Sequence, residues 1–150
     1  MPHFAEGDLV KVPIPNYCNS APVKVLYASK VFKDAMGIGV CQWIKPNGTL
    51  RNIEVAPIKG TPIYTTVKAN GWEVIGNRGL TELEENLTLR LVGDSVYNKD
   101  TFLREATESD LKTLHKMYGA GLTAAEEWIA KILNGQPINF KPHNYYEDDL

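Results

Sequence analysis

Apolar and polar residues alternate over short stretches in the first 60 residues, a pattern that predicts β-strands. Residues 8–14 (DLVKVPI) alternate, and the prolines inside and after this stretch end the strand or confine it to a sheet edge. Residues 38–44 (IGVCQWI) and 49–58 are separated by Lys-Pro-Asn-Gly. Because Asn-Gly is a strong hairpin signal, we expect these two stretches to pair.

Residues 23–32 (VKVLYASKVF) fit two patterns. As a strand, the stretch places Val25 and Tyr27 on one side. As a helix, it stacks Val25 on Ala28 and Phe32. The β-branched and aromatic content favours the strand.

Strand patterns continue beyond residue 60. Residues 62–68 alternate, and residues 72–75 form a short apolar run between glycines. Residues 87–92 show the clearest alternation, which predicts that the leucines face inward and that Thr88 and Arg90 face outward. These strands either extend the first sheet or form a second small one.

The period changes to that of helices after residue 104. Thr107-Glu108-Ser109-Asp110 is typical of a helix N-terminus, and Gly119 is placed to end that helix. Thr123-Ala124-Ala125-Glu126 predicts a capping box for a second helix, which Asn134-Gly135 stops. We therefore expect a helical hairpin over residues 105–135. The second helix carries one apolar stripe, made of Ala125, Trp128, Ile129, Ile132 and Leu133.

Together these elements predict an α+β fold. Residues 1–60 form a small curled β-barrel, residues 61–104 add strands, and residues 105–135 form the helical hairpin. Residues 136–150 contain two prolines and end in an aromatic-acidic cluster, which is typical of a tail. A chain of 150 residues fits one domain, so we expect one compact unit.

Three short motifs in the first part of the chain carry a resemblance to a known fold. They are Phe4-Ala5-Glu6-Gly7-Asp8-Leu9-Val10, Pro22-Val23-Lys24-Val25 and Val40-Cys41-Gln42-Trp43. Together they resemble SH3-like and KOW-type barrels, and among these the short YodC-like family. The resemblance covers residues 4–57, with a longer first loop and a different segment between Ala28 and Gly37. It implies an SH3-like barrel and no particular activity.

Composition and charge limit the possible partners. Hydrophobic residues make up 43% and charged residues 23%, as in ordinary globular proteins, and the net charge is −2. The charge is uneven, because residues 1–60 hold seven Lys and Arg against four Asp and Glu, whereas residues 107–150 hold four against seven. This gradient is too mild for a dedicated nucleic-acid-binding protein, but it permits an anionic partner on the N-terminal part.

The sequence favours a cytoplasmic location. The first ten residues lack the features of a secretory signal, and no stretch reaches the roughly 20 apolar residues needed to span a bilayer. We therefore expect no membrane partner. Cys18 and Cys41 do not form a C-x-x-C motif, so we expect free thiols, with Cys41 buried as a small hydrophobic residue.

Motifs for catalysis, metal binding and phosphate binding are missing from the sequence. His3, His115 and His143 are scattered, and no cysteine lies near them. Gly37-Ile38-Gly39 lacks the third glycine of a dinucleotide-binding loop and is typical of a loop that leads into a strand. The acidic run at 82–85 is typical of a solvated face. We therefore predict a protein that is not an enzyme and binds neither metal nor cofactor.

Basic and aromatic residues are interleaved in the predicted barrel. Such a face can hold a nucleic-acid backbone and stack bases. Alternatively, the aromatic residues belong to the core and the lysines only increase solubility. The candidate binding residues are Lys24, Lys30, Lys45, Arg51 and Trp43.

The C-terminal part offers a second candidate surface. Trp128 suits a partner or dimer face, because Glu126 and Glu127 make DNA reading by the same helix unfavourable. Tyr145 and Tyr146 precede three acidic-tail residues and suit docking on a basic partner, although a disordered end explains them equally well.

The leading hypothesis is a non-enzymatic protein-binding adaptor or modulator. Phages and other mobile elements encode small acidic proteins of this kind, which act on host machinery. The partner is then another protein, and a homodimer is compatible with the Trp128 face. The alternative hypothesis is a nucleic-acid-associated regulator that uses the basic face of the barrel.

Overall fold

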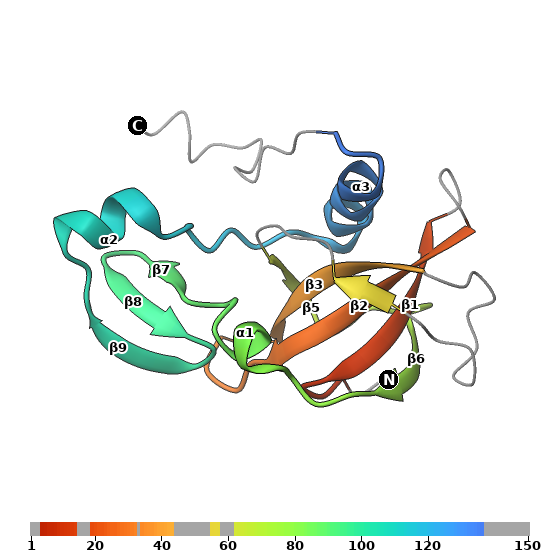
Figure 1. Cartoon of the computed structure of the whole chain (residues 1–150), viewed down its shortest axis with the longest axis horizontal. Coiled ribbons are helices and arrows are strands. Elements are labelled where there is room, and N and C mark those ends of the chain that lie inside the picture. Colours follow the sequence, from red (N-terminus) through yellow and green to blue (C-terminus); the bar gives the residue numbers. More distant parts are fainter. Residues whose placement is uncertain (1–3, 15–18, 33, 44–54, 58–61, 137–150) are drawn as a thin grey trace.

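The structure, a computed structural model, describes residues 4–14, 19–32, 34–43, 55–57 and 62–136. In these residues the fold is α+β, as predicted, with antiparallel sheets and short helices (Figure 1). In the described part of the chain, no helix is long and apolar enough to cross a membrane.

The first sheet contains six strands. They are β1 (Asp8–Ile14), β2 (Asn19–Ala28), β3 (Ala35–Trp43), β4 (Val55–Pro57), β5 (Ile63–Thr66) and β6 (Glu73–Asn77). Strand β1 lies between β2 and β6, and β2 pairs with β3. Two strands share the far edge of β3: β5 pairs with its first half and β4 with its end. The strand interpretation of residues 23–32 is thus confirmed for residues 23–28.

The turn before β1 explains the Gly-Asp pair. Gly7 has a φ of +89°, and a Cβ at this position would lie 2.7 Å from the carbonyl oxygen of Arg78. The buried Asp8 carboxylate accepts hydrogen bonds from the backbone N–H of Ala5 (2.8 Å) and from Nδ2 of Asn77 (2.9 Å). Residue 7 therefore needs a glycine, and residue 8 a short acceptor side chain.

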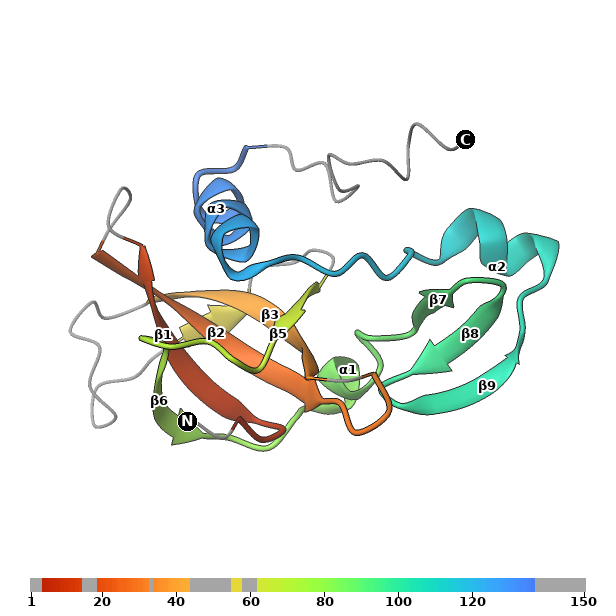
Figure 2. The ribbon, with the colours of Figure 1, turned by 180° about the vertical axis from the view of Figure 1, so that it is seen from behind.

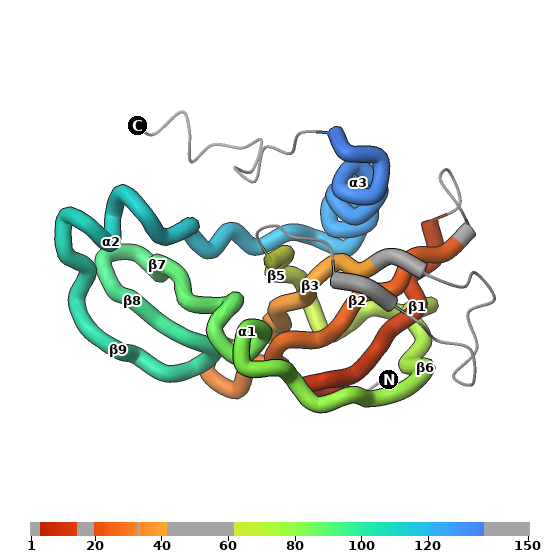
Figure 3. Tube along the Cα trace, in the orientation of Figure 1, coloured from red at the N-terminus to blue at the C-terminus, as the bar shows by residue number. Residues whose placement is uncertain are grey.

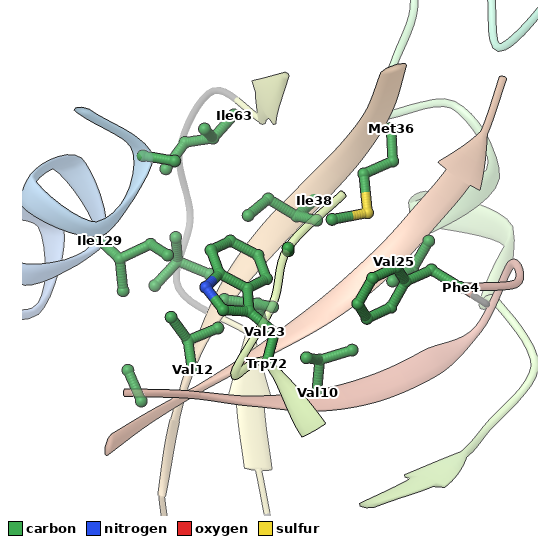
Figure 4. Close-up of a cluster of buried hydrophobic side chains, with 14 of the residues drawn as sticks. Phe4, Val10, Val12, Val23, Val25, Met36, Ile38, Ile63, Trp72 and Ile129 are labelled. Carbon is green, nitrogen blue, oxygen red and sulfur yellow. The ribbon is translucent and has the colours of Figure 1, made fainter. Parts of the chain in front are cut away.

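Inward-facing side chains of the curled first sheet form the main core, and helix α3 (Leu122–Leu133) covers its open side (Figure 4). Ala125 and Ile129 are the fully buried residues of this helix. Trp72 lies in the centre of the cluster and donates from Nε1 to Oε2 of Glu126 (2.9 Å). The predicted apolar stripe therefore packs on the sheet, while Trp128 is half-buried at the border of the core.

A second sheet lies beside the first. It contains β7 (Arg90–Val92), β8 (Ser95–Asn98) and β9 (Thr101–Glu105), and it is flanked by α1 (Glu82–Glu85) and α2 (Glu108–Thr113). Seen from behind, the two sheets form neighbouring lobes of one molecule (Figure 2). Of the strands predicted beyond residue 60, β5 and β6 extend the first sheet, whereas β7 belongs to the second sheet together with β8 and β9, which were not predicted individually.

Residues 115–120, here called the strap, connect the two sheets (Figure 3). On the second sheet, the N–H of Leu91 donates to the carbonyl of His115, and the N–H of Met117 donates to that of Leu91, both at 2.9 Å. On the first sheet, the N–H of Ala120 donates to the carbonyl of Tyr64 at 2.7 Å. The strap therefore uses its backbone groups to bridge sheets rather than to form a helix.

For this reason the predicted helical hairpin is wrong. Helix α2 begins after the expected N-cap, Thr107, which forms a capping box with Asp110, but it ends at Thr113 because the strap follows. Helix α3 begins at Leu122, with Gly121 as its N-cap and no side-chain cap, so the box predicted at Thr123 is not formed. The two helices lie on different sheets and are clearly separated (Figures 1 and 2).

Two strand predictions also need correction. In residues 87–92 the polar Thr88 and Arg90 are completely buried, whereas Leu87 and Leu89 are only partly buried. The Gly37-Ile38-Gly39 motif lies inside β3 and not in a loop before it. Of the stretch predicted at 49–58, only β4 lies within the described residues, and it pairs with β3 as expected.

Candidate functional site

The junction of the two sheets is built around Arg90, a fully buried residue of β7. Its Nη1 donates to the carbonyl of Thr88 (2.9 Å), and its Nη2 donates to the hydroxyl of Tyr27 (2.8 Å). Its Nε donates to Sδ of Met117 in the strap at 3.4 Å. A single side chain therefore links β7 to β2 and to the strap.

Aromatic rings surround the guanidinium group of Arg90. The carbon Cζ lies 5.1 Å from the ring centre of Tyr27, 5.2 Å from that of Tyr64 and 5.6 Å from that of Phe32. Among the described residues, no carboxylate forms an ion pair with Arg90. Attraction to the negative ring faces therefore takes the place of a counter-ion.

The titratable groups around Arg90 are not suited to proton transfer near neutral pH. Burial, and then the charge of Arg90, lower the pKa of His115 to about 4. Burial raises the pKa of Tyr27 to about 12 and that of Tyr64 well above its usual range. Tyr64 Oη and Nε2 of His115 form a hydrogen bond of 2.8 Å. General acid–base catalysis needs a pKa near the working pH, and we therefore interpret this cluster as structural.

A row of aromatic side chains runs from Arg90 to the surface of the second sheet. Phe32 contacts Tyr97 with ring centres 5.3 Å apart, and Tyr97 contacts Phe102 at 5.7 Å, both edge to face. Phe32 and Tyr97 are partly buried, whereas Phe102 is 51% exposed. We call Phe32, Tyr97 and Phe102 the aromatic row.

Polar contacts hold the aromatic row in place. Asp100, at the tip of the β8–β9 hairpin, accepts from Oγ of Ser29 (2.5 Å) and from the N–H of Lys30 (2.7 Å). Lys99, beside it, forms ion pairs with Glu6 and Glu85. The hairpin is therefore fixed both to the β2–β3 turn, which carries Phe32, and to α1.

Two exposed apolar residues are neighbours in sequence of this row. Among the described residues, the exposed large apolar side chains are Val31, Val74, Leu83, Phe102, Leu103 and Leu111. Val31, 60% exposed, directly precedes Phe32, and Leu103 directly follows Phe102. All five residues of β9 are exposed, and β9 is the end strand of its sheet. The sequence did not reveal this surface, because its three rings come from separate stretches; the adjacent Phe102 and Leu103 were the only local sign.

Lys24 does not lie on a binding face. It is buried, and its Nζ donates to Oε1 of Glu84 (2.8 Å) and to the carbonyl of Gly79 (3.1 Å). Burial alone would raise the pKa of Glu84, but hydrogen bonds from Lys24 and Thr81 outweigh it and lower this pKa. Lys24 is therefore not available for a nucleic-acid contact or a solubilising role. In the acidic run at 82–85, Glu82 and Glu85 are exposed as predicted, but Glu84 is buried.

The other predicted binding residues are not brought together. Lys30 is exposed in the β2–β3 turn, whereas Trp128 lies on α3, which packs on the first sheet. Trp43 belongs to β3 by its backbone. The side chain of Trp43 lies outside the described residues, as do Lys45, Arg51, Tyr145 and Tyr146.

Much of the positive charge on the described surface is already paired. Lys11 lies 3.5 Å from Glu73, Lys68 lies 3.2 Å from Asp34, and Arg104 binds Asp110 through two hydrogen bonds. Internal pairing of this kind leaves fewer cations to replace the counter-ions of a nucleic-acid backbone.

Other features of the described residues give no ligand site. No three His, Cys, Asp or Glu side chains gather there as metal ligands would. Cys41 is buried, and burial raises the pKa of its thiol to about 12, as expected for a small hydrophobic residue.

One open depression of about 240 Å³ lies between β5 and the strap, near Asp34, Met117 and Gly119. It is smaller than typical small-molecule sites.

A scan against protein-family models gave no match for this chain, and searches of curated proteins and of solved structures gave none either.

Proposed function

We propose that the chain is a non-enzymatic protein-binding adaptor or modulator whose partner docks on the aromatic row and the apolar residues beside it. The observation that supports this is the continuous contact from Phe32 through Tyr97 to the exposed Phe102, flanked by Val31 and Leu103. The proposal moves the docking surface away from the barrel face and Trp128, where the sequence had placed it.

The physical chemistry of interfaces fits this surface. Binding energy concentrates in aromatic residues that are rigid before the partner arrives, because little side-chain entropy is then lost. Tyr97 is packed between the two phenylalanines, and Asp100 fixes the underlying turn. Exposed rings held in this way are costly to leave in water, and a partner surface removes that cost.

Docking through side chains suits β9 better than addition of a partner strand. The pairing of β8 with β9 shifts register between Val96 and Tyr97, so Leu103 has no partner residue on β8. Such a bulge bends an edge strand and interrupts the even spacing of its free backbone groups. We therefore expect the partner to contact Phe102 and Leu103 rather than continue the sheet.

The test is site-specific photocrosslinking. A benzophenone side chain at Leu103 should give a discrete adduct with a partner protein in extract of the source cells. The same group at Val74, an exposed apolar residue of β6 in the first sheet, serves as the matched control and should give none. The substitution Phe102→Ser in the Leu103-labelled protein should abolish the adduct, because the ring at the surface end of the row is lost.

Unchanged circular dichroism and melting temperature of the Phe102→Ser protein would show that the fold is retained. Equal adducts at both positions, or an adduct that survives Phe102→Ser, would contradict the proposal.

Three further predictions from the sequence, on the type of barrel, the location and the origin of the protein, are also proposals. We propose that the first sheet is an SH3-like barrel related to the YodC-like and KOW-type families. We also propose a cytoplasmic location and an origin in a phage or mobile element. The curl of the six strands supports the first of these.

A further inference from the structure

We propose that Met117 is a site of reversible oxidation to methionine sulfoxide, and that the sulfoxide fastens the strap to Arg90. This inference does not depend on the protein-binding proposal, because it concerns the strap and not the aromatic row. It rests on three features of Met117: the partial exposure of the residue, the contact of its sulfur with a buried cation, and the weakness of that contact.

Met117 is the accessible one of the two methionines in the described residues. It is only partly buried and lines the open depression between β5 and the strap. Met36, by contrast, is fully buried in the core of the first sheet. Oxidation of methionine follows exposure, so a small peroxide reaches Met117 first.

The thioether of Met117 is the acceptor for Nε of Arg90, at 3.4 Å. Sulfur is a weak acceptor, and Arg90 has no carboxylate partner among the described residues to satisfy its charge. A sulfoxide oxygen is a much stronger acceptor. On Met117, the sulfoxide oxygen would lie next to the guanidinium group of Arg90 and could accept its Nε–H.

The reaction is balanced with hydrogen peroxide as the oxidant. A sulfur lone pair attacks one peroxide oxygen, the O–O bond breaks, and a sulfoxide and one water molecule form. The sulfur loses two electrons and the peroxide gains them. Methionine sulfoxide reductases reverse this step with thiols as the reductant.

The expected consequence is a tighter strap. The N–H of Met117 already donates to the carbonyl of Leu91, next to Arg90 in β7, so the backbone on both sides of the new hydrogen bond is fixed. Replacing a thioether acceptor with a charge-assisted hydrogen bond should slow local opening by on the order of tenfold.

The experiment treats the full chain with hydrogen peroxide and follows both methionines by peptide mass spectrometry. Met117 should be oxidised at least about tenfold faster than Met36. Hydrogen exchange should then slow on the order of tenfold at the amides of Leu91 and Met117, and recover after treatment with the reductase. The amide of Val25, in the first sheet, is the internal control and should not change.

Two variants distinguish sulfoxide formation at Met117 from oxidative damage elsewhere in the protein. Met117→Leu keeps the volume without the sulfur, so peroxide should leave its strap exchange unchanged. Met117→Gln places an amide oxygen where the sulfoxide oxygen would be, and should slow exchange without peroxide. Equal oxidation rates at Met36 and Met117 would overturn the proposal, as would faster or unchanged strap exchange in the oxidised protein.

Discussion

A guanidinium group is costly to remove from water, and Arg90 is removed from it completely. Three hydrogen bonds and the faces of three aromatic rings offset this cost. These contacts come from β2, β5, the β2–β3 turn, the strap and Thr88, which lies just before β7. At the scale of one residue, the junction between the sheets is therefore a set of partners arranged around one cation.

Arg90→Ala should lower the free energy of unfolding by about 3 kcal/mol, because it leaves a cavity and removes the donors for Tyr27 and Thr88. Arg104→Ala is the matched control in the same sheet, since the Arg104 side chain is half-exposed and its loss should cost less than that of the fully buried Arg90. Urea unfolding followed by tryptophan fluorescence measures both. Similar losses in the two variants would show that Arg90 is not the centre of the junction.

The burial of Arg90 could not be predicted from the sequence. Alternation in residues 87–92 places leucines on one face and polar residues on the other, and the usual assumption is that the polar face meets water. Here the polar face meets rings from Tyr27, Phe32 and Tyr64, which are more than 20 positions away in the chain. The aromatic row was missed for the same reason.

At the scale of elements, strand β3 shows why its two glycines differ. A Cβ at Gly37 would lie 2.8 Å from Cε1 of Tyr27 and 3.2 Å from Cε1 of Tyr64. The nearest atoms to a Cβ at Gly39 would be side-chain carbons of Leu26, at 3.7 Å or more. Gly37 therefore allows the rings of Tyr27 and Tyr64 to approach β3 closely, whereas Gly39 has no such role.

Gly37→Ala should cost about 1–3 kcal/mol, because Tyr27 and Tyr64 must move away from their contacts with Arg90. Gly39→Ala should leave stability unchanged or raise it slightly, since alanine reduces the freedom of the unfolded chain. Differential scanning calorimetry on the two variants makes the comparison. Equal melting temperatures would mean that the rings adapt to the extra methyl group.

Strands were predicted more successfully than the arrangement of helices. Alternation and short apolar runs are local properties, and they located β1, β2, β3, β5 and β6 to within a few residues. The strap has the composition of a helix end, with Tyr118 and Gly119, but its hydrogen bonds go to Leu91 and Tyr64 on two different sheets. Tertiary hydrogen bonds of this kind override local patterns and leave no periodic signal.

At the scale of the whole molecule, two contact regions join the lobes. One is the strap with Arg90 and His115, and the other is the β8–β9 tip with Asp100 and Lys99. The buried pair of Lys24 and Glu84 also fastens α1 to the first sheet. His115 belongs to the first of these regions, so its protonation should weaken the contact between the two lobes.

The stability of the fold should depend on His115 in mildly acidic solution. Its pKa is about 4 in the folded protein and 6.5 when it is free in the unfolded chain, so the unfolded chain binds more protons between these values. Stability is therefore fully present above pH 6.5 and falls as the pH decreases towards 4. Protonation would also bring a second positive charge close to Arg90, whose charge already lowers the pKa of His115.

Melting temperatures measured between pH 7 and pH 4 test this, with His115→Gln as the control. The glutamine can still hydrogen-bond to Tyr64 but does not titrate, so the fall in this range should be smaller in the variant. A parallel fall in both proteins would assign the pH dependence to other groups.

The position of β1 between β2 and β6 has a consequence for how the chain is made. Asn77 pairs with Asp8, 69 positions earlier in the chain. At translation rates of about 5–20 residues per second, roughly 3–14 s pass between the synthesis of the two residues. During that time the β6-facing edge of β1 has no partner in its own molecule, although the β2-facing edge can already be paired. The speed of the ribosome therefore sets how long one nascent chain offers this edge to another.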